Sequence, residues 1–89
     1  MTDRIMTEDV DPMAIAERIV QAFVRTGEAH ADASYADSYG AEVVVRIGRR
    51  LSRGWQDMGT VTVTVTGDLE IEASRRRAWI ARTAKEVAS

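Results

Sequence analysis

The chain has 89 residues, of which 45% are hydrophobic and 29% are charged, and its net charge is −2. These proportions are those of ordinary globular chains, so they exclude a disordered or fibrous protein, and the length allows one domain with a thin core. The absence of cysteine excludes disulfide bonds and thiolate metal sites and favours a reducing compartment, so we expect a cytoplasmic protein.

Residues 1–10 alternate acidic with isolated apolar residues and contain no apolar run of the length that a signal peptide or a membrane span requires. We expect a flexible segment here and a single compact domain over residues 11–89. The domain opens with a helix, because Asp11 is a favoured N-cap residue and Pro12 fits the first helical position. Apolar residues then recur at three- and four-residue spacing until Gly27, a residue type that favours helix C-termini. The pattern predicts a helix of about fifteen residues.

Residues 28–40 have two interpretations. Alanines at every second position from Ala29, followed by Tyr35, fit a strand, whereas the same alanines and the i,i+4 pair of Tyr35 and Tyr39 fit a helix. Alanine has a low strand propensity, so the sequence favours neither. If the segment is a strand, residues 37–40 form a turn.

The next segment, residues 41–48, is predicted to be a strand, because β-branched residues alternate along it. A competing helix would gain an apolar stripe with one member every four residues from Val43 to Trp55. Three successive valines and the nearby glycines weaken that helix. Residues 49–59 are then interpreted as a loop that carries Leu51 and Trp55.

The clearest strand covers residues 60–66, where alternation puts the valines on one face and the threonines on the other. A two-residue turn at Gly67 would place Val65 beside Glu70 on one face, and the pattern excludes it. A three-residue loop, residues 66–68, brings every apolar side chain to one face instead. It pairs Val65 with Leu69, Val63 with Ile71 and Val61 with Ala73. One long strand bent at Gly67 satisfies the pattern equally well.

Ser74 is a favoured N-cap residue, and the apolar residues of the following segment, residues 75–88, fall on one helical stripe. The stripe comprises Trp79, Ile80, Thr83, Ala84 and Val87. The predicted order is helix, strands, helix (α-β-β-β-α). It indicates an α+β fold, with an antiparallel sheet of three to four strands and helices packed on one face.

This order, together with the basic helix start Ser74-Arg75-Arg76-Arg77-Ala78, resembles double-stranded-RNA-binding domains in outline. The strand lengths differ from those of that family, and its contact histidine in a loop has no counterpart here. The resemblance therefore implies an order of elements and carries no RNA-binding function with it.

Charge is divided unevenly along the chain. Residues 1–42 carry nine acidic residues and three arginines, whereas residues 43–89 carry nine basic and five acidic residues. The second half holds two arginine clusters, one of Arg46, Arg49, Arg50 and Arg53 and one of Arg75, Arg76 and Arg77. Arginine suits bidentate contacts to phosphate, so the clusters predict a nucleic-acid-binding face. The alternative is that they form salt bridges to the acidic first half, which would explain why three arginines open a helix against its dipole.

Three further features bear on partners. Trp55 is interpreted either as an anchor for a protein partner or as a residue folded back onto the thin core. Trp79 is predicted to be a core residue, because it lies on the apolar stripe of its helix. The threonine face around Thr62 and Thr64 is a candidate for pairing with another chain, including a second copy, if its strand lies at a sheet edge.

Catalysis is not indicated, because the chain has one histidine, no cysteine and no glycine-rich phosphate loop. His30 and Asp32 alone do not make a metal site. We therefore predict no catalytic residue, no metal and no cofactor.

The sequence thus favours a small non-enzymatic protein-interaction module, of the kind that phage and mobile-element genes encode, with another protein as its partner and no membrane contact. The candidate partner-binding residues are Trp55, Arg49, Arg50, Arg53, Arg75, Arg76, Thr62 and Thr64. One alternative is a nucleic-acid-binding domain that uses the arginine clusters at 46–53 and 75–77. A second is a homo-oligomeric structural component, such as a homodimer formed by strand pairing.

Overall fold

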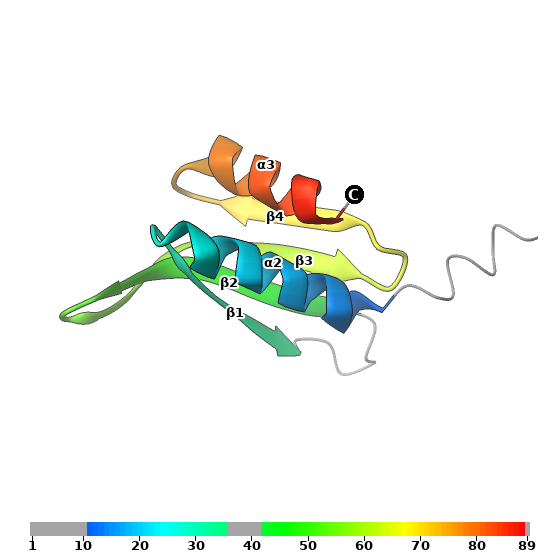
Figure 1. Cartoon of the computed structure of the whole chain (residues 1–89), viewed down its shortest axis with the longest axis horizontal. Coiled ribbons are helices and arrows are strands. Elements are labelled where there is room, and N and C mark those ends of the chain that lie inside the picture. Colours follow the sequence, from blue (N-terminus) through cyan, green and yellow to red (C-terminus); the bar gives the residue numbers. More distant parts are fainter. Residues whose placement is uncertain (1–10, 36–41, 89) are drawn as a thin grey trace, which may run out of the picture.

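Two helices lie on one face of a four-stranded antiparallel sheet in the computed structural model, which describes residues 11–35 and 42–88 (Figure 1). The elements in chain order are α2 (Pro12–Thr26), β1 (His30–Tyr35), β2 (Glu42–Leu51), β3 (Gly54–Thr64), β4 (Leu69–Ala73) and α3 (Arg77–Ala88). The strands are ordered β1-β2-β3-β4 across the sheet. This architecture confirms the predicted α+β class and its antiparallel sheet of three to four strands, with one strand more than the predicted α-β-β-β-α order. The segment expected to be flexible, residues 1–10, and the turn expected at residues 37–40 lie outside the described residues.

Helix α2 has the ends that the sequence predicts. The Asp11 carboxylate accepts a hydrogen bond from the Met13 amide at 3.1 Å, and Gly27 ends the helix with a φ of 74°. This left-handed conformation is open to glycine because it lacks a Cβ atom. The buried face of α2 consists of Ala16, Ile19 and Phe23.

The strand interpretation of residues 28–40 is confirmed over His30–Tyr35. Strand β1 pairs antiparallel with β2, with Ala33 opposite Val45. The alternation also holds, because Ala31 and Ala33 pack against the core while His30 and Asp32 are exposed.

The loop predicted over residues 49–59 is wrong. Strands β2 and β3 continue through this segment as a hairpin closed by a two-residue turn, with Arg50 opposite Trp55 and Leu51 opposite Gly54. The hairpin extends past the helices (Figure 1). Residues 49–55, toward the tip, are exposed. They need no apolar alternation, because the two strands satisfy each other's backbone groups and no core has to be covered.

A β-bulge interrupts the hairpin between Ile47 and Gly48 of β2. Ile47 pairs with Gly59 and Gly48 pairs with Asp57, so Met58 is an extra residue on β3. An extra residue shifts the side-chain alternation by one position. Met58 therefore points to the core, whereas the residues of β3 before it exchange faces.

Strands β3 and β4 form a hairpin, and the alternative of one bent strand is wrong. The predicted pairing is off by two residues, since Leu69 lies opposite Val63 and not opposite Val65. The loop therefore covers residues 65–68, and Val65 is half exposed. A shift of two residues keeps all side chains on their predicted faces.

Helix α3 begins at Arg77, so the prediction that Ser74 is its N-cap is wrong. The Ser74 amide and hydroxyl donate to the Met58 carbonyl at 3.1 and 3.5 Å and extend the contact of this segment with β3. Arg76 precedes the helix, and its carbonyl accepts from the Ile80 amide at 3.0 Å.

The core lies between the helices and the inner sheet face. Its buried members are Ala16, Ile19, Phe23, Ala29, Val43, Val45, Ile47, Met58, Val61, Val63, Ile80 and Ala84. Trp79 is half-buried and meets Phe23 edge-on, with ring centroids 5.2 Å apart, which confirms its predicted place against the core. The opposite face of the sheet, called the outer face below, carries no helix among the described elements (Figure 1).

Candidate functional site

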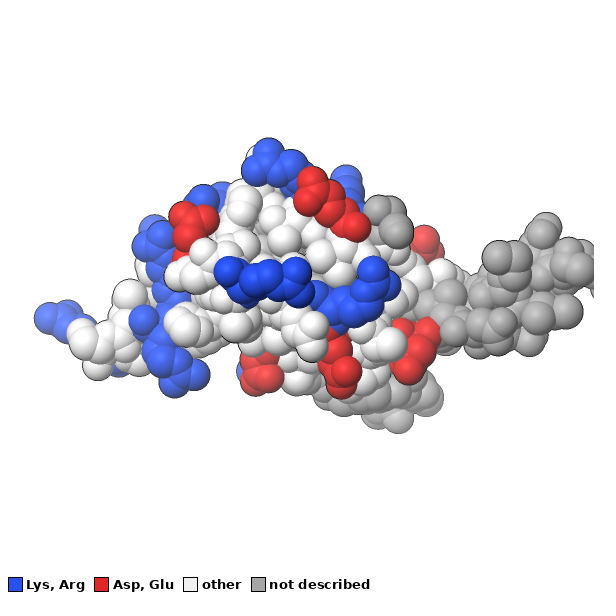
Figure 2. All heavy atoms as spheres, viewed as in Figure 1, with Lys and Arg blue, Asp and Glu red and all other residues white. Residues whose placement is uncertain are grey.

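Basic side chains gather at the end of the molecule from which the β2–β3 hairpin projects (Figure 2). We call these residues the arginine surface: Arg46, Arg49, Arg50 and Arg53 of the hairpin with Arg75 and Arg76 of the β4–α3 loop. Arg53 lies in the turn at the hairpin tip, and the remaining members are divided between the two faces of the hairpin.

On the helix side, the two arginine clusters of the sequence come together. Arg49 of β2 lines a cavity of about 150 Å³ with Arg75 and Arg76, and Gln56 and Met58 complete its lining. This proximity depends on the hairpin, because the paired strands hold Arg49 on the same side of the sheet as α3. Arg77, the last member of the second cluster, lines a separate cavity with two acidic residues, Asp57 and Glu72.

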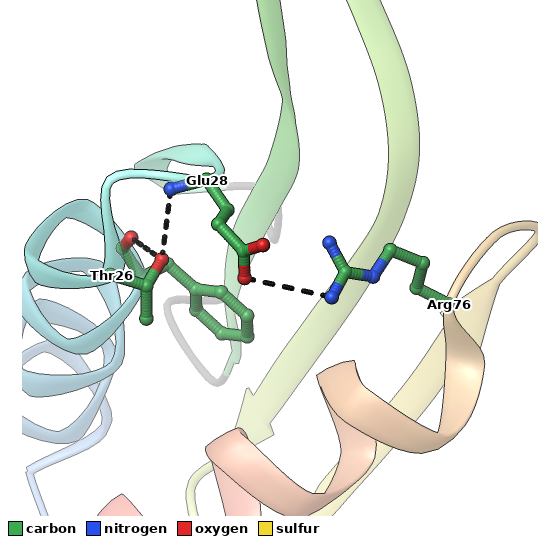
Figure 3. Close-up of polar contacts among 4 residues, drawn as sticks. Thr26, Glu28 and Arg76 are labelled. Carbon is green, nitrogen blue, oxygen red and sulfur yellow. Dashed lines mark hydrogen bonds and ion pairs between the residues drawn. The ribbon is translucent and has the colours of Figure 1, made fainter.

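Arg76 is tied to the rest of the fold. Its guanidinium lies 3.5 Å from the Glu28 carboxylate (Figure 3). The same guanidinium lies 4.3 Å from the centroid of the Trp79 ring. Glu28 is positioned by its own amide, which donates to the Thr26 hydroxyl at 3.3 Å. The predicted salt bridge between the arginines and the acidic first half is therefore confirmed for Arg76. None of the other arginines in the surface is ion-paired with a described acidic residue.

On the outer face, Trp55 lies beside Arg46 and Arg50. These three residues line a cavity of about 490 Å³, which we call the outer-face cavity. The remaining lining residues come from β1 and are His30, Ala31 and Asp32. Trp55 is 43% exposed and is not part of the core, so the interpretation in which it folds back onto the core is wrong.

The indole of Trp55 rests on Gly48. A Cβ atom at Gly48 would lie 2.6 Å from two carbon atoms of the indole ring and 2.5 Å from the Gln56 carbonyl oxygen. Real Cβ atoms do not approach other atoms so closely, so only glycine allows the ring to lie across the strand. The sequence points to neither Gly48 nor Ala31, and it raises His30 and Asp32 only as potential metal ligands, because the proximity of these residues to Trp55 depends on the register of three strands.

Thr62 and Thr64 lie on the outer face of β3, opposite Val44 and Glu42 of β2, and neither lines the outer-face cavity. Strand β3 is an interior strand, paired with β2 on one side and with β4 on the other. The condition for the predicted pairing of this strand with another chain, a place at a sheet edge, is therefore not met, because its threonine segment is already paired on both sides. The Thr64 hydroxyl is also engaged, accepting from the Asp68 amide at 3.1 Å.

Other kinds of site find little support in the described part of the chain. His30 is exposed, and residues 11–35 and 42–88 contain no group of three potential metal ligands. No helix among the described residues is long and apolar enough to cross a membrane.

Comparisons with protein-family models, curated proteins and solved structures found no match to this chain. The likeness to double-stranded-RNA-binding domains rests on a predicted order with three strands, whereas the described residues form four. The basic triplet also does not open the last helix as that likeness implied, since α3 begins at Arg77. The partner and the phage or mobile-element origin stay predictions.

Proposed function

We propose that this chain is a binding module that contacts nucleic acid through the arginine surface. The observation that supports this most is the cavity shared by Arg49, Arg75 and Arg76, because it brings arginine side chains from two separate segments to one place. Arg49 and Arg75 have no ion-pair partner among the described acidic residues. Arginines left without a carboxylate partner suit phosphate, which they contact through two parallel hydrogen bonds.

The net charge of −2 does not oppose this proposal. Four of the 14 acidic residues, Asp3, Glu8, Asp9 and Asp37, lie outside the described part of the chain, as does Arg4 among the 12 basic residues. The described part therefore carries 11 basic and 10 acidic residues. Local charge governs contact with a polyanion at short range, since salt screens interactions beyond about 10 Å.

The test is oligonucleotide binding by a charge-reversed variant, Arg49→Glu with Arg75→Glu. Fluorescence anisotropy with labelled single-stranded and duplex oligonucleotides at low salt is expected to show at least about tenfold weaker binding, because two phosphate contacts become repulsive. Arg18→Glu with Arg82→Glu is the matched control, because it makes the same charge change at exposed helix positions. Equal losses in both variants, or no oligonucleotide binding by the unaltered protein, would overturn the proposal.

A protein partner is the second candidate, and exposed apolar residues on the hairpin favour it. Leu51 is 48% exposed and Trp55 is 43% exposed, which phosphate contacts alone do not require. Large apolar side chains of this kind are frequent anchors in protein interfaces. In this case, a Leu51→Ala/Trp55→Ala variant is expected to lose a co-purifying protein that the Arg49→Glu/Arg75→Glu variant retains.

A further inference from the structure

The outer-face cavity combines an aromatic surface with positive charge. Gly48 supports one side of the Trp55 indole, and the exposed remainder of the ring is available to a ligand. The bulge at Met58 is what places Trp55 here, since an uninterrupted alternation from Val61 would have directed it toward the helices. The fold therefore presents a fixed aromatic platform on the face of the sheet that lies opposite the helices.

Two arginines flank this platform along β2. Arg50 lies directly opposite Trp55 in the strand register, and Arg46, four residues before Arg50 in β2, lies on the same face. Four residues of strand separate their Cα atoms by about 13 Å, so the two side chains lie on either side of Gly48, over which the indole lies. Neither arginine is ion-paired with a described acidic residue.

The opposite wall of the cavity belongs to β1 and is mixed in character. Asp32 lies directly opposite Arg46 on the neighbouring strand, and His30 lies directly opposite Gly48. A carboxylate in the wall disfavours a ligand that is uniformly anionic. It can instead accept hydrogen bonds from the amino and ring N–H groups of a nucleobase. The volume of about 490 Å³ falls in the usual range of small-ligand sites, about 300–1,000 Å³.

We propose that the outer-face cavity takes an unpaired nucleobase of a single-stranded nucleic acid. The base stacks on Trp55, and the neighbouring phosphates contact Arg46 and Arg50. A base within a duplex is stacked between its neighbours and cannot enter the cavity, so this site confers a preference for single strands. The inference rests on the proposed function and specifies which form of nucleic acid the chain prefers.

The experiment compares Trp55→Ala and Trp55→Phe with the unaltered protein. Binding of the full chain to a labelled single-stranded oligonucleotide, as DNA and as RNA, and to a duplex of equal length is measured by anisotropy. Loss of one stacked base is expected to weaken single-strand binding about five- to 150-fold in Trp55→Ala. Duplex binding is expected to stay within about twofold, because phosphate contacts are unchanged. Trp55→Phe keeps an aromatic ring and is expected to retain most of the affinity for single-stranded DNA and for single-stranded RNA.

Leu51→Ala is the matched control, because Leu51 is an equally exposed apolar residue of the same hairpin and alternates with Arg50 onto the opposite face. A second readout is tryptophan fluorescence. Single strands are expected to quench the fluorescence of the unaltered protein. They are expected to quench that of the Trp55→Phe variant only slightly, because its remaining tryptophan is Trp79. Single-strand binding that is unaffected by Trp55→Ala, or weakened equally by Leu51→Ala, would overturn the inference. If duplex binding still depends on Arg49 and Arg75, the proposed function survives that result; if no oligonucleotide binds, both fall.

Discussion

At the scale of single residues, Arg76 has a backbone conformation that its side chain stabilises. Its φ of 50° is left-handed, which costs a non-glycine residue about 1–2 kcal/mol. Contacts with Trp79 and Glu28 offset this cost. We expect Arg76→Ala to lose about 1 kcal/mol of unfolding free energy with those contacts, and Arg76→Gly to lose less, because glycine relieves the backbone. Urea unfolding measures both variants, and an Arg76→Gly variant less stable than Arg76→Ala would contradict this account.

The sequence identifies most of the candidate residues by their type, but it does not predict which of them lie together in the fold. Arg49 and Arg75 were singled out by charge, and their shared cavity requires the hairpin to extend through a polar segment that no apolar alternation marks. For Trp55 the sequence leaves open whether it anchors a partner or folds back onto the core. Its place beside Arg50 depends on one extra residue, Met58, and a bulge leaves no signature in the alternation of side chains when the residues before it are polar.

At the scale of elements, the loop between β3 and β4 is held by its own side chains. The Thr64 hydroxyl bonds with the Thr66 hydroxyl at 2.9 Å and accepts from the Asp68 amide, while the Thr64 amide donates to the Asp68 carbonyl at 3.0 Å. This network explains why each residue of β4 pairs with a residue of β3 that lies two positions earlier in the chain than predicted. Hydrophobic alternation specifies which face a residue occupies, and registers that differ by two residues satisfy it equally, so local hydrogen bonds decide between them.

The network predicts that two threonines of the same strand respond differently to the same substitution. Thr64→Val removes the hydroxyl that bonds the loop and is expected to cost about 0.5–1.5 kcal/mol of unfolding free energy. Thr62→Val, on the same face of β3, is expected to be neutral or slightly stabilising, because no hydrogen bond of its hydroxyl is resolved among the described residues and valine favours strands. Urea unfolding compares the two, and equal effects would show that the hydroxyl network does not hold the loop.

At the scale of the whole molecule, the core lies on the inner face of the sheet, and the outer face carries no helix among the described elements. Both helices pack on the inner face, where the core lies, so the outer face and the projecting hairpin can carry charge without cost to packing (Figure 1). The uneven charge of the sequence is only partly neutralised by folding, since within the arginine surface Arg76 alone is ion-paired with a described acidic residue. Five arginines of that surface remain for a polyanion: Arg46, Arg49, Arg50, Arg53 and Arg75.

This count predicts how binding depends on salt. Each neutralised phosphate contributes about −0.7 to the slope of log affinity against log salt for single strands, so five contacts give a slope of about −3.5. Replacing Arg49 and Arg75 with alanine is expected to reduce the magnitude of the slope by about 1.4, because two contacts disappear. Titrations of a labelled single strand at a series of salt concentrations measure it, with Arg18→Ala/Arg82→Ala as the control. A slope that falls equally in the control would mean that charge acts through the molecule as a whole, and a slope that falls in neither would place the phosphates away from the arginine surface.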